Sequence, residues 1–384
     1  GTTAASFPEL VEQLGVKRFG HRPKLADTFC GSGQIPFEAA RIGCDAFGSD
    51  LNPVAGLLTW AGLNLLGGGP QVQQEVIRVQ AAVLKAADEQ VTAWGIEHNG
   101  RGERADAYLY CVEVKPEGCE YFIPLAGNWL VGEKTRVVCR WRRVPGSDRL
   151  QPEIAVVDEA EVKLYKDKKG ATVIDSRVLD PFNPGRSWSV EALPGPDGLR
   201  RWTNDDVVPR SGDVFQERLY CIRWVDAVGA RRYAAPDDED LQRETRVLEL
   251  LRERFVDWQR EGFIPSKAIV SGFNTDQPIR ERGWTRWHHL FTPRQLLTQG
   301  VVAMQAERIA DTRPARAACL LGLGRMADWN SRLSAWMFHA TNEKGNQVFY
   351  NQALNCHSNY SARGLSKLDD TFTLLEGATS ERIV

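Results

Sequence analysis

Near the start of the chain the residues read Lys24-Leu25-Ala26-Asp27-Thr28-Phe29-Cys30-Gly31-Ser32-Gly33, followed by Gln34-Ile35-Pro36-Phe37-Glu38-Ala39-Ala40-Arg41-Ile42-Gly43. This order predicts a strand, a glycine turn and a helix. Gly31 and Gly33 permit backbone angles that a Cβ atom forbids, and Pro36 falls in the first helical turn, where a missing N–H is tolerated. A second short strand at 45–50 ends on Asp50. Small residues let a ligand approach the turn, and an acid at the next strand tip can accept hydrogen bonds from ribose hydroxyls.

The spacing of these residues resembles that of a motif found in known enzymes. Asp27-x-Phe29-x-Gly31-x-Gly33 is similar to motif I of the amino-directed DNA methyltransferases, which bind S-adenosylmethionine. Asp50-Leu51-Asn52-Pro53 resembles the acidic second motif of the same enzymes. The run 26–55 is more similar still to large bacterial and archaeal adenine-specific DNA methylases of the DUF1156 type. Further similar segments occur at 216–224 and 291–297.

The resemblance implies an S-adenosylmethionine site in the glycine loop and at the end of the second strand. Asp27 would take the cofactor's amino group directly or through water, Asp50 would hold the ribose, and Leu51 would pack on adenine. The residues expected at the cofactor are Asp27, Thr28, Phe29, Cys30, Gly31, Ser32, Gly33, Asp50, Leu51 and Asn52.

Two other interpretations of this stretch remain open. The same residues can simply shape a turn, or the turn can belong to an ordinary nucleotide fold that binds NAD. The G-x-G-x-x-G of such folds is not present, because Gly31 and Gly33 are followed by Pro36 rather than by a third glycine.

Length and composition indicate a globular protein of two or three domains, with 384 residues, 42% of them hydrophobic and 26% charged. The formal net charge of -2 gives no global basic field for nucleic acid, although a local basic face is enough to bind it. No apolar run approaches a membrane span and no secretory signal is visible, so we expect a cytoplasmic protein without a membrane partner. The eight cysteines lack tight paired spacing, which is typical of buried free thiols in a reducing compartment.

The predicted fold class is α/β: a partial Rossmann-like methyltransferase domain with a large β-rich insert and a helical region. Residues 1–98 form the N-terminal part of the methyltransferase domain with the cofactor motif. They include a helix at 7–16, the β-α-β-α unit at 24–66 and a long helix from 71 to 94.

The β-rich insert is expected at 99–236, where alternating apolar residues and turn residues follow one another. Its candidate strands are 107–114, 120–125, 136–143, 153–157, 171–174, 188–192, 219–224 and 231–234, with a hairpin tip at 166–170. The third segment, 237–384, is a helical region that leads back into the methyltransferase domain. Its helices are expected at 237–261, 293–310 and 313–337, with a loop at 263–290 and a polar segment at 341–366.

The catalytic tetrapeptide of the resembled enzymes, Asp/Asn/Ser-Pro-Pro-Tyr/Phe, is missing, and the catalytic residues stay unknown. In those enzymes its first side chain and a carbonyl accept the hydrogens of the target amino group, while its aromatic ring stacks on the flipped base. The sequence contains no Pro-Pro dipeptide, and the nearest imitation, Asp180-Pro181-Phe182-Asn183, lies in the insert. The resembled enzymes carry the tetrapeptide shortly after the region that corresponds to Val384. We therefore expect a segment of a longer protein.

A zinc ribbon with two C-x-x-C knuckles occurs in some of the resembled enzymes. Here seven residues separate Cys111 from Cys119, a spacing too wide for a knuckle. The insert therefore resembles a degenerate ribbon, and no metal is expected. Convergence of Cys111, Cys119, Cys139 and Cys221 in space is the remaining route to a zinc site.

A loop at 280–289 mixes arginines with aromatic residues and is a candidate nucleic-acid contact, because arginine grips phosphates and aromatic rings stack on bases. The residues in question are Arg280, Arg282, Trp284, Arg286 and Trp287. An aromatic core plug with solvated arginines explains the loop equally well. For the similar runs at 140–143 and 200–202, core packing is favoured.

The function implied by the resemblance is S-adenosylmethionine-dependent DNA adenine-N6 methylation, with this chain supplying the cofactor-binding and target-recognition segment and being inactive alone. Expected partners are DNA and other subunits of a defence or modification system. An inactive methyltransferase-like scaffold that binds DNA or a partner is the alternative from another class. Cytosine-N4 and RNA guanine-N2 methyltransferases use the same motifs and are not separated from the first hypothesis.

Overall fold

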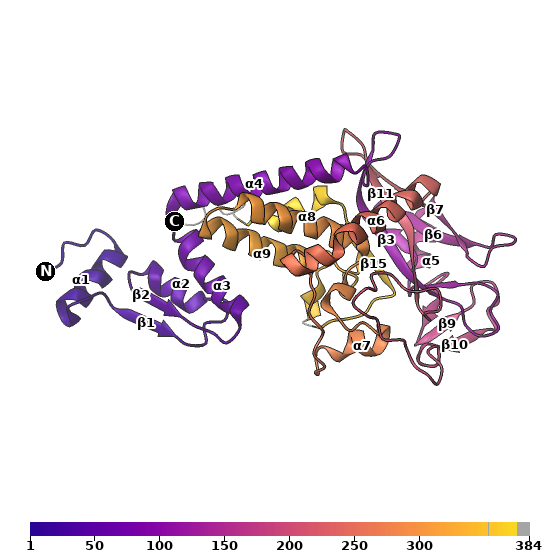
Figure 1. Ribbon diagram of the computed structural model, residues 1–384, viewed down its shortest axis with the longest axis horizontal. Coiled ribbons are helices and arrows are strands. Elements are labelled where there is room, and N and C mark those ends of the chain that lie inside the picture. Colours follow the sequence, from indigo (N-terminus) through magenta and orange to yellow (C-terminus); the bar gives the residue numbers. More distant parts are fainter. Residues whose placement is uncertain (352, 375–384) are drawn as a thin grey trace. The chain divides into compact units, whose positions relative to one another are not determined.

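The computed structural model describes residues 1–351 and 353–374 (Figure 1). They form two compact units. The first contains Gly1–Lys85, Gln305–Gly324 and a short piece from Phe372, and the second contains Ala86–Met304 and Arg325–Thr371. Each unit is therefore built from segments that are far apart in the sequence, whereas the expected segments 1–98, 99–236 and 237–384 are contiguous.

The first unit holds the β-α-β-α arrangement expected at 24–66. Its elements are α1 (Phe7–Phe19), β1 (Lys24–Asp27), α2 (Gln34–Arg41), β2 (Asp45–Gly48) and α3 (Pro53–Ala61), followed by a π-helical turn at Gly62–Leu66. β1 and β2 pair in parallel, with Asp27 opposite Gly48. The carboxyl ends of both strands therefore lie at one edge, where ligands bind in open α/β sheets.

A buried amide joins three segments of this unit. Gln80 lies on α4 (Gly69–Ala93), and its Nε2 donates hydrogen bonds to the carbonyls of Ala318 (3.2 Å) and Phe372 (2.8 Å). Its Oε1 accepts from the Leu374 N–H at 3.1 Å. Ala318 belongs to α9 (Arg313–Trp329), so one side chain holds the middle of α4 against α9 and the last described residues.

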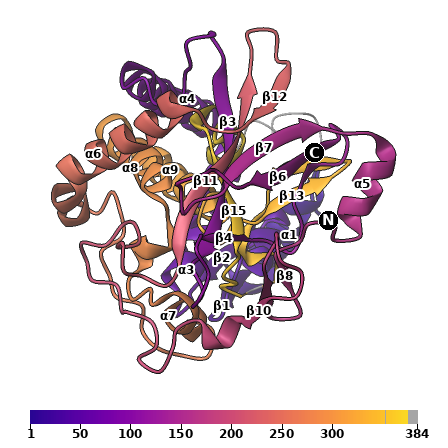
Figure 2. The same cartoon turned by 90° about the vertical axis from the view of Figure 1, so that its right-hand side faces the viewer.

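The second unit is organised around an antiparallel sheet in the order β12-β11-β3-β15, with β4 also paired to β3. The strands are β3 (Arg104–Val114), β4 (Ile123–Leu125), β11 (Gln216–Val225), β12 (Arg231–Ala234) and β15 (Asn359–Arg363). Alternate residues of β3 enter two different core clusters: Tyr108 and Tyr110 pack in one, Leu109 and Cys111 in the other. Because both faces of β3 are covered, this strand is the centre of the unit (Figure 2).

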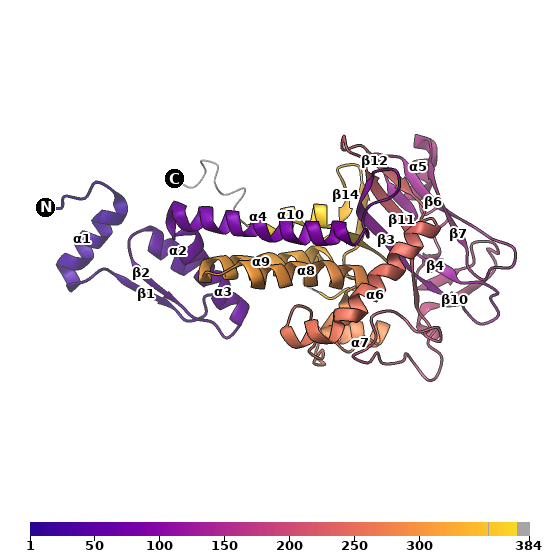
Figure 3. The same cartoon turned by 45° about the horizontal axis from the view of Figure 1, so that its top comes forward.

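Other elements begin in the second unit. They are the sheet β5 (Leu130–Gly132), β6 (Val137–Arg142), β7 (Gln151–Val156); the sheet β8 (Val173–Ile174), β9 (Arg177–Leu179), β10 (Ser187–Ser189); the hairpin β13 (Trp336–His339), β14 (Asn342–Gly345); and the helices α5 (Glu159–Lys166), α6 (Asp238–Glu261), α7 (Asp276–Arg282), α8 (Pro293–Ile309) and α10 (Asp369–Phe372). Figure 3 shows α6 as one continuous helix, which begins at an Asp237–Asp240 capping box and ends at the left-handed Gly262.

Three details of the predicted elements are wrong. The predicted hairpin tip at 166–170 is the last residue of α5 and the turn that follows this helix, which Asp158 caps by accepting the Glu161 N–H. The helix predicted at 313–337 ends at Trp329, because serine hydroxyls at 331 and 334 accept backbone N–H groups and compete with the helix. The loop predicted at 263–290 contains the helix α7 at Asp276–Arg282.

The search for membrane-spanning helices was negative across the described residues: none is long and apolar enough to cross a bilayer.

Candidate functional site

Asp50 ties the glycine loop to the start of α3. Its Oδ2 accepts a hydrogen bond from the Gly31 N–H at 3.0 Å, and its Oδ1 accepts one from the Asn52 N–H at 2.8 Å. The hydrogen bonds from Asn52 and Gly31 lower the pKa of the Asp50 carboxyl, so it is ionised at neutral pH. Each carboxylate oxygen has a second lone pair, and the carboxylate can therefore also accept hydrogen bonds from a ligand.

Asp27 lies at the end of β1, on the same edge as Asp50. Its carbonyl accepts the Ser49 N–H at 2.9 Å, and the Cys30 N–H donates to the Ser49 carbonyl at 3.0 Å. The pairing of the two strands thus continues into both loops. The Asp27 carboxylate accepts the Phe29 N–H at 3.1 Å, which fixes the first turn of the loop. The two acids that the sequence predicted at the cofactor are thereby held on adjacent, hydrogen-bonded loops.

The two glycines of the loop serve different purposes. Both have positive φ, +51° at Gly31 and +82° at Gly33. A Cβ added at Gly33 would lie 2.7 Å from the Cα of Thr59 on α3, so this glycine lets the loop pack against the helix. A Cβ added at Gly31 would meet nothing within 4 Å. The backbone at Gly31 consequently faces open space, which a ligand can enter.

We predict that Gly33→Ala lowers the free energy of unfolding by about 2–5 kcal/mol, because strain at positive φ adds to overpacking against Thr59. For Gly31→Ala we expect the free energy of unfolding to fall by only about 1–2 kcal/mol, because backbone strain is the sole cost. Urea unfolding of both variants checks this order. Equal losses in the two variants would contradict the assignment of separate roles.

Of the remaining predicted cofactor residues, some have exposed side chains and others have side chains that already form hydrogen bonds within the protein. Phe29 and Leu51 are apolar yet 80% and 95% exposed, and Thr28 and Ser32 are also on the surface. Cys30 is buried, and its Sγ accepts the Thr59 hydroxyl at 3.1 Å. The Asn52 Oδ1 accepts the Val54 N–H at 3.0 Å and so caps α3. The Cys30 side chain therefore packs against α3, and the Asn52 side chain is engaged in capping.

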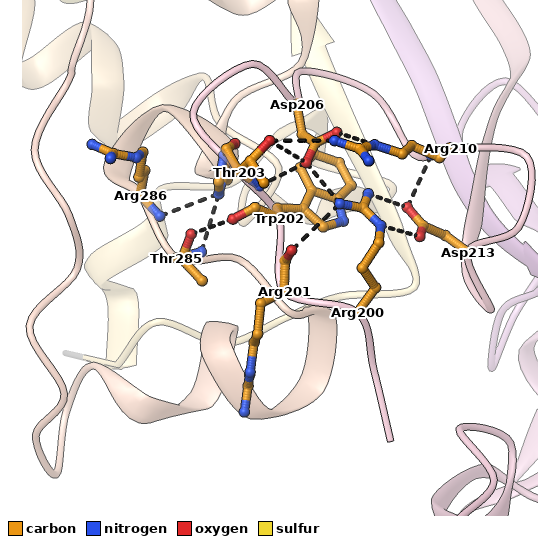
Figure 4. A network of polar contacts seen from close by, with 10 residues as sticks. Arg200, Arg201, Trp202, Thr203, Asp206, Arg210, Asp213, Thr285 and Arg286 are labelled. Carbon is orange, nitrogen blue, oxygen red and sulfur yellow. Dashed lines mark hydrogen bonds and ion pairs between the residues drawn. The ribbon is translucent and has the colours of Figure 1, made fainter. Parts of the chain in front are cut away.

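The loop at 280–289 is anchored mainly by its aromatic residues. Trp284 is 4% exposed and packs with Trp202 in a core cluster, so its ring has no free face for a base. Trp287 is partly buried against the same cluster. The Trp202 N–H donates to the Gly283 carbonyl at 2.9 Å, and the Thr285 hydroxyl donates to the Trp202 carbonyl at 2.5 Å (Figure 4).

The three arginines of this loop differ in their freedom. Arg282 donates to the Glu281 carbonyl at 2.9 Å and lies over the Phe215 ring. Arg286 donates to the Ser266 carbonyl at 2.7 Å. The Arg280 side chain is mostly exposed beside Glu281. Core packing therefore explains the tryptophan at 284, while a phosphate contact by Arg280 or Arg286 stays a prediction.

A carboxylate network braces the neighbouring loop that carries Trp202. Asp206 accepts hydrogen bonds from Arg200 Nη1, Arg210 Nε and the Thr203 N–H, at 2.7, 2.7 and 2.6 Å (Figure 4). Arg200 also donates to both oxygens of Asp213, at 2.6 and 2.7 Å. These pairs lower the pKa of Asp206 against the effect of its burial. Trp202 is buried, as the core interpretation of 200–202 expects, but Arg200 is held in internal ion pairs rather than solvated.

His288 and His289 are buried and neutral. His289 Nδ1 accepts the N–H groups of Thr285 (3.0 Å) and Arg286 (3.2 Å), and Nε2 lies 2.9 Å from the Thr203 carbonyl, to which it donates. Burial lowers the pKa of His288 to about 4 and that of His289 to about 3. A protonated imidazole at 289 would face two N–H donors, which the fold cannot accommodate.

We predict that acidification destabilises this unit well before its carboxylates titrate. In the unfolded chain the imidazoles bind protons near pH 6.5, whereas in the folded chain they do not. The free energy of unfolding is therefore highest above pH 6.5 and falls as the pH decreases toward 4. The slope reaches about 1.4 kcal/mol per pH unit for each imidazole. Urea unfolding at pH 7.5, 6 and 5 checks it, with His289→Gln expected to flatten the profile. An unchanged unfolding free energy between pH 7.5 and 5 would be incompatible with neutral buried histidines.

The cysteines of the insert are part of the hydrophobic core. Cys111, Cys139 and Cys221 belong to one cluster, whereas Cys119 packs in the other. Burial raises the pKa of Cys111 to about 12 and those of Cys139 and Cys221 well above the usual value, which disfavours the thiolates that zinc requires. Within residues 1–351 and 353–374, no three His, Cys, Asp or Glu side chains are grouped to hold a metal ion.

The first unit thus presents a strand–turn–helix with ionisable groups at the carboxyl ends of two parallel strands, the arrangement of a ligand-binding edge. Comparison with known proteins adds no assignment: no family model, curated protein or solved structure matches the chain.

Proposed function

We propose that the chain is the S-adenosylmethionine-binding and target-recognition part of a DNA adenine-N6 methyltransferase. The observation that carries this proposal is the double anchoring of the Asp50 carboxylate by the N–H groups of Gly31 and Asn52. It holds an ionised acceptor at the tip of β2, beside a glycine whose backbone faces open space. A ribose requires such an acceptor for its two hydroxyls.

The other groups on this edge suit the remaining parts of the cofactor. The Asp27 carboxylate can accept hydrogen bonds from the ammonium group of the methionine moiety. The exposed Leu51, next to Asp50, offers an apolar surface for the adenine ring, and burying it would remove its side chain from water. The bound cofactor supplies a methyl group on a positively charged sulfonium. We assign these residues to holding and orienting it, and no residue to the acceptor amine.

Target recognition is proposed for residues 105–340, which lie outside the glycine-loop edge. A surface that reads DNA there would use arginines such as Arg280 and Arg286 for phosphates. The alternative proposal is an inactive scaffold with a methyltransferase-like fold. The lack of a Pro-Pro dipeptide in these 384 residues would favour it only if Val384 were the last residue of the protein. The two proposals differ in whether the glycine loop binds the methyl donor.

The proposal is tested by calorimetric titration of the chain with S-adenosylhomocysteine, S-adenosylmethionine and NAD. We expect the first two to bind and NAD to give no heat of binding. NAD binding in the absence of S-adenosylhomocysteine binding would support an ordinary nucleotide fold instead. No binding of any of the three would support the scaffold.

A further inference from the structure

A charged pocket of about 240 Å³ opens in the second unit, beside the main sheet. Strands β3, β11 and β15, the β13–β14 hairpin and the segment after β15 all contribute to its wall. The hairpin approaches β15 closely because residue 345 is glycine: a Cβ there would lie 2.6 Å from the Ser361 hydroxyl. The pocket is thus built by the packing of several strands.

Cations outnumber carboxylates in the wall. The five cationic side chains are Arg223, Arg231, Lys344, Arg363 and Lys367, and the three carboxylates are Asp106, Glu343 and Asp370. Two of the three acids are already engaged. Asp106 accepts two hydrogen bonds from the buried Arg223, at 2.5 and 3.0 Å. Glu343 accepts hydrogen bonds from Thr135 (3.0 Å) and Tyr233 (2.9 Å).

Arg363 is a cation of the wall whose hydrogen bonds go to carbonyl groups. Its Nη2 donates to the Gly345 carbonyl at 2.9 Å and its Nη1 to the Lys367 carbonyl at 3.4 Å, and it lies over the Trp329 ring. The nearby Asp106 carboxylate instead pairs with Arg223 and Arg231. Burial, together with the nearby charge of Arg223, lowers the pKa of Arg363 to about 10, against the opposite effect of Asp370 and Asp106. A half-buried cation under such repulsion favours the entry of an anion.

We propose that this pocket binds a phosphate group. Phosphate carries about two negative charges and several acceptor oxygens, which match the excess of two cations and the unused N–H groups of Arg363 and Lys367. A pocket of this volume has room for a phosphoryl group with part of its hydration shell. The source is either a small free phosphate compound or a phosphodiester strand, since both present the same oxygens.

This proposal is independent of methyl-donor binding, because all residues of the pocket wall belong to the second unit. Failure of the S-adenosylhomocysteine titration therefore leaves it standing.

The test is a calorimetric titration of the full chain with pyrophosphate at low salt, using wild type, Lys367→Gln and Lys163→Gln. Lys163 is an exposed lysine on α5 and serves as the matched control. We expect Lys367→Gln to weaken pyrophosphate binding about tenfold, the factor that corresponds to 1.4 kcal/mol, and Lys163→Gln to bind like wild type. A trinucleotide without terminal phosphates, added as competitor, separates the sources because it presents phosphodiesters alone: displacement of pyrophosphate indicates a nucleic-acid strand, and no displacement indicates a small free anion. Absence of pyrophosphate binding to wild type, or equal weakening in both variants, would overturn the proposal.

Discussion

Asparagine in place of Asp50 is expected to weaken S-adenosylhomocysteine binding by about 100-fold or more. Both oxygens of the Asp50 carboxylate accept backbone N–H groups, from Gly31 and from Asn52. An amide has a single oxygen, so in either orientation its NH₂ group faces one N–H donor. The substitution therefore removes the charged acceptor for the ribose hydroxyls and weakens the attachment of the loop. The hydrogen bonds from Gly31 and Asn52 are no longer charge-assisted, and this loss sets the expected factor in affinity.

Asp45→Asn is the matched control for this prediction, because Asp45 is an exposed acid at the opposite end of β2. Calorimetric titration of both variants checks it. If Asp50→Asn bound S-adenosylhomocysteine as tightly as wild type did, the glycine loop would not be the cofactor site.

The second large effect is expected in the core of the second unit, at Arg332. This side chain is fully buried and forms two ion-paired hydrogen bonds with Glu217, at 2.7 and 2.8 Å. It also donates to the carbonyls of His289 and Val207, each at 2.8 Å. Arg332→Met leaves the Glu217 carboxylate and both carbonyls unpaired away from water, so we expect the free energy of unfolding to fall by about 3–5 kcal/mol.

The comparison variant is Arg260→Met on α6, whose side chain is 70% exposed and pairs with Asp257. Its effect should stay within about 0.5 kcal/mol, as is usual for surface positions. Urea unfolding of the two variants measures the difference. A loss at Arg332 no larger than that at Arg260 would mean that Arg332 is not the anchor between the Trp202 loop and the sheet.

The sequence predicted those helices and strands that are marked by their own turn, capping or apolar residues. The glycines and Pro36 marked the strand, turn and helix at 24–43, and the acids at 237–240 marked the start of α6. β3 and β11 were also visible as apolar strands. β15 was missed because it is short and pairs with β3 from the other end of the sequence, so its neighbours are not local. The cap at Asp158 was a local signal for α5 that could have been used.

For the candidate site, the sequence indicated which residues gather but not what each side chain does. Asp27, Asp50 and Gly31 lie together as the strand order requires. The use of Cys30 for packing and of Asn52 for capping depends on α3 lying against the loop, which a motif does not reveal. The burial of Trp284 likewise depends on Trp202, a residue from a distant loop.

The most direct test of the cofactor assignment is a crystal structure of the chain soaked with S-adenosylhomocysteine. We predict that the ribose hydroxyls donate to the Asp50 carboxylate, that adenine lies on Leu51, and that the homocysteine part lies beside Gly31 near Asp27. A ligand bound at any other place in the chain, or a ribose turned away from Asp50, would contradict the account.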